Sequence, residues 1–241
     1  MCGRYTITRV DGHGLAQRFG VHESAIEAAT LGRYNVCPTE RVLAVCTDGD
    51  APAARGLRWG LVPPWARSLG AGYEPINARA ETVASKRPFA ELVARADRRC
   101  LVVADGWYEW LRQERPRGTR IPFRYTVDGG EPVAFAGLWD VRRVGGEEVA
   151  SVTVLTTAAN AVCMPVHDRM PCVLESVDAE AAWLSPHVDA AAAAELLAPL
   201  EAARTAAAPA NPAVNRAGVE GPELLVVGEP ADEAPAQLRL V

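Results

Sequence analysis

The chain has 241 residues, of which 49% are hydrophobic and 23% are charged, a composition ordinary for a globular protein with a sizeable core. It contains no apolar run long enough to cross a bilayer and no N-terminal secretory stretch, so we expect a cytoplasmic protein without a membrane partner. Six cysteines without a CxxC pair indicate free thiols, and we expect neither a metal nor a cofactor.

Charge is distributed unevenly along the chain, whose formal net charge is −5. Residues 1–125 contain 19 Lys and Arg against 13 Asp and Glu, whereas residues 126–241 contain 6 against 17. This asymmetry allows a basic face on an acidic protein. Every basic residue except Lys86 is an arginine, which suits bidentate phosphate contacts, although a genome of high GC content explains the same preference equally well.

The first half of the chain predicts short elements separated by turns. A strand is expected at residues 1–8, followed by a helix at 14–19 that ends at Gly20. Pro38 forces an extended residue before it, so 33–39 is predicted as a loop. The other expectations are a strand at 42–47, a turn-rich aromatic segment at 57–65, a segment at 76–84 leading into a helix, a helix at 88–96 and a buried strand at 100–104.

The second half adds strands, one long loop and the remaining helices. The predicted strands are 123–127, 133–138 and 149–157, followed by a loop at 158–171, helices at 178–184 and 189–204 and an Ala/Pro-rich linker near 205–212. Many short strands with few helices indicate one α+β domain rather than a series of βαβ units.

Cys2 is the first residue that suggests chemistry. Removal of Met1 before this small residue would give it a free α-amine beside its thiol. Such an amine has a pKa of about 7.7–8.0, so a useful fraction is neutral at pH 7 and attacks aldehydes to give a Schiff base. The thiol then closes a five-membered thiazolidine ring. The competing interpretation is a small buried residue at the start of a strand.

Three further polar residues lie in loops or beside aromatic residues. Asn77 stands in INARAET, Glu109 in WYEW and His167 in VHDRMP. A carboxylate among aromatic residues is desolvated, which raises its pKa toward the range useful for proton transfer, and histidine titrates there without help. Taken singly, each also fits a structural role, namely a helix cap, a surface carboxylate and a loop histidine.

A series of ordered motifs is more specific than any single residue. They are MCGRYT, RYNVCPT, RWGLVPPW, INARAET, ADGWYEW, AGLW, LTTAAN, HDRMP and WL, between residues 1 and 186, with a weaker match at 213–225. This pattern strongly resembles the SOS-response-associated peptidase (SRAP) family, whose members shield abasic sites in DNA. The resemblance implies one SRAP domain over residues 1–228, with mostly antiparallel short strands in a barrel-like core flanked by helices, and a tail at 229–241.

The resemblance also implies roles for four residues. Cys2 matches the cysteine that becomes N-terminal and bonds to the ring-opened abasic sugar, and Asn77 matches the asparagine that orients the reacting groups. Glu109 matches the glutamate that moves protons, and His167 matches the histidine that assists ring opening and crosslink release. Weak lyase action is a further expectation, because a Schiff base at the sugar promotes β-elimination.

The implied partner is single-stranded DNA that contains an abasic site, with the protein associated with the nucleoid when bound. Such DNA needs a basic groove and apolar or aromatic platforms, and its affinity falls with salt. The positions matched to DNA contact are Arg4, Pro38, Trp65, Arg79, Lys86, Arg87, Thr156 and Arg169. The sequence does not identify a protein partner, because it contains no recognisable recognition motif for one.

Three alternatives remain open. In an amidotransferase of the N-terminal-nucleophile type, Cys2 would attack an amide with its own α-amine as base. In a cysteine peptidase, Cys2 and His167 would form a thiol–imidazole pair, and self-processing at the initiating residue would be its minimal activity. The third alternative is a single-strand binding module without covalent chemistry. Only covalent capture predicts a denaturation-resistant adduct with abasic DNA.

Overall fold

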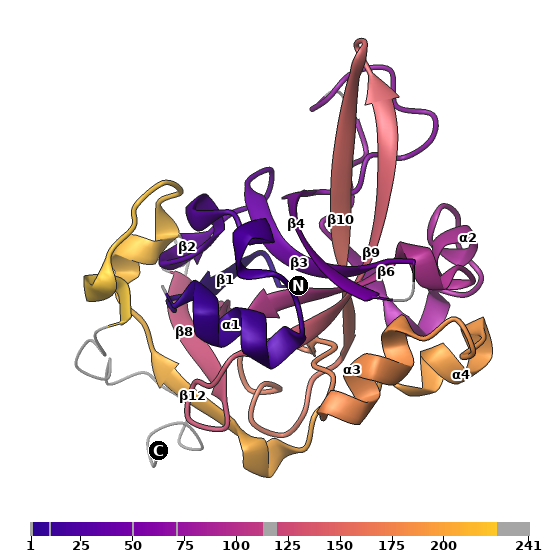
Figure 1. Cartoon of the computed structure of the whole chain (residues 1–241). Coiled ribbons are helices and arrows are strands. Elements are labelled where there is room, and N and C mark those ends of the chain that lie inside the picture. Colours follow the sequence, from indigo (N-terminus) through magenta and orange to yellow (C-terminus); the bar gives the residue numbers. More distant parts are fainter. Residues whose placement is uncertain (1, 10, 50, 71, 113–119, 226–241) are drawn as a thin grey trace.

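Two β-sheets form the centre of this computed structural model (Figure 1). The structure describes residues 2–9, 11–49, 51–70, 72–112 and 120–225. One sheet has the order β12-β8-β7-β1-β2 and consists of β1 (Arg4–Ile7), β2 (Arg33–Val36), β7 (Gly106–Arg112), β8 (Arg120–Val127) and β12 (Thr205–Pro209). The other consists of β3 (Arg41–Asp48), β4 (Ala51–Trp59), β5 (Asn77–Arg79), β6 (Arg99–Ala104), β9 (Val133–Val144), β10 (Glu147–Ala158) and β11 (Arg169–Pro171).

The second sheet closes on itself. Strands β10, β4, β3, β6 and β9 follow one another, and β9 pairs again with β10, which gives a five-stranded barrel. Among the described strands only β4 and β5 run parallel to β10, and the other pairings are antiparallel. Figure 1 shows the β9–β10 hairpin extending beyond the barrel as an arm. The predicted α+β fold with a barrel-like, mostly antiparallel core is therefore confirmed.

Short helices lie around the sheets. They are α1 (Gly12–Phe19), α2 (Phe89–Val93), α3 (Val177–Leu184) and α4 (Ala190–Glu195). Helix α1 begins at Asp11, whose carboxylate accepts the Gly14 N–H, and it ends at Gly20 with φ 65°, as predicted. Arg18 of α1 binds Glu180 of α3 through two hydrogen bonds of 2.8 and 2.7 Å. In the described part of the chain, no helix has the length and apolar character needed to span a membrane.

Two predicted loops are strands, because distant parts of the chain supply their hydrogen-bond partners. The predicted loop at 33–39 contains β2, which pairs with β1, while Glu220 accepts the N–H groups of Tyr34 and Asn35. The predicted linker at 205–212 contains β12, which pairs with β8 along its whole length. The hydrogen-bond partners of both strands lie far away in the sequence, so a short window does not reveal them. In β12 this tertiary pairing also overrides the weak strand propensity of alanine.

Two predicted helices are also wrong in extent. The helix expected at 189–204 ends at Glu195, because Pro199 cannot continue it and disfavours helical backbone at the residue before it. The helix expected at 88–96 is limited to α2, Phe89–Val93. The segment at 76–84, expected to lead into a helix, contains β5 and a single 3₁₀ turn, Ala80–Thr82.

The six predicted strands are all present, although β9 continues to Val144. Strands β4 and β7 were not predicted, and β11 lies within the predicted loop at 158–171. The predicted tail at 229–241 lies outside the described residues, and the domain boundary at 228 stays a prediction.

Aromatic packing joins the first sheet to the barrel. Tyr5 of β1 packs edge-on against Trp59 of β4 at 5.4 Å and Phe135 of β9 at 6.1 Å between ring centroids. Trp107 of β7 stacks on Tyr125 of β8 at 5.3 Å. These side chains are completely buried, so they hold the N-terminal strand against the barrel and fix the position of Cys2.

Candidate functional site

The pairing of β1 with β7 brings the N-terminal strand next to Glu109. Arg4 lies opposite Tyr108, and Thr6 lies opposite Gly106. Because the two strands are antiparallel, Glu109, which follows Tyr108 on β7, lies beside the residue that precedes Arg4. A Cβ at Gly106 would lie 2.7 Å from the Tyr125 carbonyl oxygen, so only glycine allows this close approach of β8.

Asp105 fixes the same pairing from the preceding position. Its buried carboxylate accepts hydrogen bonds from the Thr6 hydroxyl at 2.5 Å and from the Thr8 N–H at 2.6 Å, and it forms an ion pair with Arg124 at 3.3 Å. The DGWYEW motif thus supplies both the anchor of β1 and the carboxylate of the candidate site.

Cys2 is completely buried and held by its backbone. The side-chain amide of Asn77 donates a hydrogen bond of 2.7 Å to the Cys2 carbonyl oxygen. Asn77 begins β5, which is fixed by parallel pairing with β10 opposite Val154. The other amide atom, Asn77 Oδ1, is buried and has no hydrogen-bond donor among the described residues. A ligand group that donates a hydrogen bond could pair with this oxygen, because buried acceptors normally have a hydrogen-bond partner.

Glu109 is only 3% exposed, and burial, together with the charge of Asp168, raises the pKa of its carboxyl to about 7. Burial and the Glu109 charge together raise the pKa of the Cys2 thiol far above its usual value. The same two causes raise the pKa of the Cys163 thiol to about 12. At neutral pH both thiols are therefore protonated, while Glu109 can exchange a proton.

His167 lies on the loop between β10 and β11, with 27% of its side chain exposed. Its Nδ1 accepts a hydrogen bond of 3.0 Å from the Arg169 N–H, which places the proton of the neutral imidazole on Nε2. When the ring is protonated, Nδ1 can instead pair with Asp168 at 3.1 Å. The loop therefore sets the tautomer of His167, next to the aspartate whose charge acts on Glu109.

The structure thus brings together Cys2, Asn77 and Glu109, with His167 next to an aspartate that influences Glu109. The model of the family described as SOS response associated peptidase (SRAP) matches residues 1–217 of this chain. The chain belongs to the SRAP family.

Relatives of this SRAP chain have related names and a related fold. The abasic site processing protein YoqW of Bacillus subtilis is 34% identical over 227 residues, which are 93% of this chain and 99% of the relative. The abasic site processing protein YedK of Escherichia coli is 30% identical over 200 residues, covering 82% and 86%. A crystal structure from Bacteroides thetaiotaomicron shares the fold with a TM-score of 0.82 at 23% identity, covering 94% of this chain and all of that one.

Three of the four exposed residues matched to DNA contact line two neighbouring pockets, and the fourth, Arg87, does not. Trp65 is 56% exposed, and Arg79 and Lys86 are also exposed. Trp65 lines a pocket of about 260 Å³, whereas Arg79, Lys86 and Asn77 line a neighbouring pocket of about 480 Å³. Both pockets share Tyr73, which is 59% exposed. The two pockets form a groove, which we call the Trp65–Lys86 groove, leading to Asn77.

The other five positions are engaged within the protein or stand apart from the groove. Arg4 donates to Asn35 Oδ1 and to the Val214 carbonyl oxygen, each at 2.7 Å. Arg169 binds Glu81 at 2.6 and 2.9 Å. Arg87 forms an ion pair with Glu91 at 3.0 Å. Thr156 is completely buried, and Pro38 is partly buried. Their contact with DNA stays a prediction.

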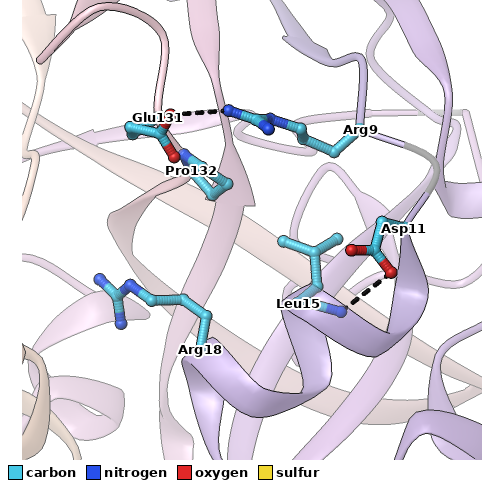
Figure 2. A pocket seen from close by; sticks show the side chains of 7 residues that line it. Arg9, Asp11, Leu15, Arg18, Glu131 and Pro132 are labelled. Carbon is cyan, nitrogen blue, oxygen red and sulfur yellow. Dashed lines mark hydrogen bonds and ion pairs between the residues drawn. The ribbon is translucent and has the colours of Figure 1, made fainter.

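Another pocket of this SRAP domain, of about 240 Å³, contains two arginines (Figure 2). Arg9 is paired with Glu131 at 2.9 Å, and Arg18 with Glu180. These carboxylates neutralise both guanidinium groups, so we do not assign an anion site to this pocket.

The motifs did not identify several residues that shape the site. Asp105 and Tyr73 gave no separate signal, although Tyr73 is an aromatic residue in a loop rich in glycine and proline, which indicates exposure. Asn160 stands in LTTAAN, but its importance depends on contacts with distant residues.

Proposed function

We propose that this SRAP chain captures abasic sites in single-stranded DNA through a covalent bond to Cys2, after Met1 has been removed. The observation that carries the proposal is the position of Cys2, held by Asn77 and electrostatically coupled to Glu109, whose pKa is about 7. The names of the relatives YoqW and YedK support the substrate class. The Trp65–Lys86 groove supplies aromatic and basic groups suited to single-stranded DNA.

The reaction begins with the opening of the abasic sugar to its aldehyde. The ring oxygen must gain a proton while the C1 hydroxyl loses one. The protonated ring of His167, whose Nδ1–H can pair with Asp168, can donate its Nε2 proton to the ring oxygen. The Glu109 carboxylate can accept the proton of the C1 hydroxyl and return it to the oxygen that leaves as water. The Cys2 amine then attacks the aldehyde carbon, and loss of water gives the Schiff base.

Ring closure adds the thiol across the C=N bond, with sulfur bonding to carbon and the thiol proton passing to nitrogen. Because the thiol pKa is raised, the proton stays on sulfur until a base removes it. Glu109 can accept this proton and deliver it to the nitrogen, since its pKa of about 7 makes both steps accessible at neutral pH. The same steps in reverse release the DNA. Elimination from the Schiff base, before ring closure, would give weak lyase action.

The raised pKa of the Cys2 thiol also bears on the alternatives. A cysteine peptidase needs a thiolate, which requires a lowered pKa next to a positive group. Burial and the negative charge of Glu109 act in the opposite direction on Cys2. These features favour attack by the amine over attack by sulfur, and they disfavour a peptidase or an amidohydrolase at this site.

The proposal is tested with three substrates in parallel: abasic single-stranded DNA, the same strand with all its bases, and a peptide that contains glutamine. We expect a species resistant to denaturation with the abasic strand alone. Equal non-covalent binding to both strands without an adduct would instead indicate a binding module. Release of ammonia or cleavage of the peptide would indicate an amidohydrolase or a peptidase.

Trp65→Ala and Tyr73→Ala are expected to weaken binding of intact single-stranded DNA, because base–aromatic stacking contributes about 1–3 kcal/mol per base. The expected loss of affinity is about 5- to 150-fold for each variant, measured by fluorescence anisotropy. Phe19→Leu, a change on α1 outside the groove, is the control. Unchanged affinity in both groove variants would show that this groove does not bind the strand.

A further inference from the structure

The loop that carries His167 is attached at its two ends to the barrel sheet. It connects β10 to β11, and its two ends are joined by a hydrogen bond of 3.0 Å from the Ala159 N–H to the Asp168 carbonyl oxygen. Glu109, in contrast, lies on β7 in the other sheet. The aromatic contacts join the two sheets as a whole, and contacts between this loop and the other sheet add a direct connection near the imidazole.

Asn160 organises the inside of the loop. Its Oδ1 accepts the N–H groups of Val162 and Cys163 at 3.1 and 3.0 Å, and its carbonyl oxygen accepts the Met164 N–H at 2.9 Å. The Cys163 carbonyl oxygen in turn accepts the His167 N–H at 3.0 Å. A short chain of hydrogen bonds thus runs from the Asn160 side chain to the backbone of His167.

The same amide attaches the loop to the other sheet. Asn160 Nδ2 donates to the Leu200 carbonyl oxygen at 3.0 Å and to Thr205 Oγ1 at 2.9 Å. Thr205 begins β12, which pairs with β8, and β8 pairs with β7 on the other side. The register places Phe123 of β8 opposite both Glu109 and Pro209 of β12, so two strand pairings connect Thr205 to the carboxylate strand.

We infer that Asn160 is a positioning residue that sets the place of His167 relative to Glu109 by connecting the histidine loop to the sheet that carries the carboxylate. All four hydrogen-bonding positions of its amide are used, two on each side of the connection. Neither a carboxylate nor a hydroxyl reproduces this pattern. The inference rests on the proposed function for its catalytic consequence, whereas the placement of the ring can be tested without DNA.

Asn160→Asp keeps the hydrogen bonds that this side chain makes within its own loop and removes those that it donates to Leu200 and Thr205. The remaining oxygen still accepts the two loop N–H groups, but an oxygen replaces Nδ2 and faces the Leu200 carbonyl oxygen. Thr205→Val is a milder variant, since it removes one acceptor and keeps the other. Asn211→Asp is the matched control, because Asn211 also accepts a backbone N–H (Ala213, 2.9 Å) and donates to a carbonyl oxygen (Glu223, 3.2 Å).

The first readout is the pair of ring carbon–proton signals of His167, measured by NMR over a pH titration in the free protein. The chain has four histidines, so His167→Asn identifies the signals. We expect Asn160→Asp to shift these signals and their titration midpoint, Thr205→Val to shift them less, and Asn211→Asp to leave them in place. His167 signals unchanged in Asn160→Asp, or moved equally in the control, would overturn the inference.

The second readout is the rate constant of adduct formation at saturating abasic DNA, with the affinity for intact DNA measured separately. We expect Asn160→Asp to lower the rate constant about 10- to 100-fold, because a displacement of about 1 Å at a catalytic group has an effect of this size. Affinity should change less than about twofold. A wild-type protein that forms no adduct would contradict the proposed function alone, while an unaltered rate in Asn160→Asp beside an active wild type would contradict the positioning role.

Discussion

Cys2→Ala is expected to form no adduct that survives heating in denaturant, at any pH at which the wild type forms one. Alanine keeps the α-amine after Met1 removal but has no sulfur to close the ring, so the reaction stops at a reversible Schiff base. Borohydride reduction should therefore trap the variant on abasic DNA, although no stable adduct forms without it. The measurement is a denaturing gel of both reactions, with and without reduction.

Cys46→Ala is the matched control for this variant. Cys46 is also a completely buried thiol, but it lies on β3 of the barrel. We expect it to form the stable adduct with the wild-type yield. A stable adduct in Cys2→Ala, or its loss in both variants, would contradict the role of the Cys2 sulfur.

Glu109→Gln is expected to slow adduct formation about 10²- to 10⁴-fold, the usual contribution of a positioned acid–base group. Glutamine keeps the shape of the side chain but cannot accept the thiol proton. In the wild type, the rate should rise as the pH passes through about 7, because the Glu109 carboxylate forms there. The variant should lose this part of the pH profile, measured by single-turnover kinetics between pH 5 and about 9.

The same substitution should stabilise the fold, with a defined dependence on pH. Burial raises the Glu109 pKa from 4.5 to about 7, so below pH 4.5 the carboxyl is protonated in both the folded and the unfolded state. Between these values only the unfolded state loses the proton, and the penalty on the folded state grows to about 3 kcal/mol above pH 7. Urea unfolding should therefore show Glu109→Gln to be more stable than the wild type at pH 8 and nearly equal at pH 4.

Glu81→Gln is the control with the opposite sign. Its hydrogen bonds to Arg169 lower the pKa of the Glu81 carboxyl, so the ionised form stabilises the folded state at neutral pH, and this stabilisation disappears as the pH falls through the lowered pKa. The glutamine variant should thus be less stable than the wild type at pH 8. A pH-independent effect at Glu109 would show that its carboxyl is not held in a desolvating environment.

The sequence predicts the fold class and the central residues for different reasons. Short apolar strands divided by glycine and proline indicate one α+β domain, whereas the resemblance of the motifs implied the barrel-like, mostly antiparallel core. The resemblance of the motifs identified Cys2, Asn77 and Glu109, which the structure brings into contact or electrostatic range. The desolvated environment of Glu109 was also foreseeable from its aromatic neighbours, although strand β7 itself was not predicted.

The features that the sequence did not predict depend on long-range partners. Strand β12 forms only because β8 offers an edge, and β2 is stabilised by Glu220, far along the chain. The role of Asn160 depends on acceptors at Leu200 and Thr205 in the same way. No periodicity or propensity within a short window contains these partners, so local rules predicted loops and a helix there.

Mass spectrometry of the native protein and of its DNA adduct tests the central claim most directly. The account predicts a protein that has lost Met1, and an adduct whose digest contains one modified peptide, beginning at Cys2 and carrying the sugar aldehyde minus one water. An adduct on protein that retains Met1, or one attached at Lys86, the sole lysine of the chain, would contradict it.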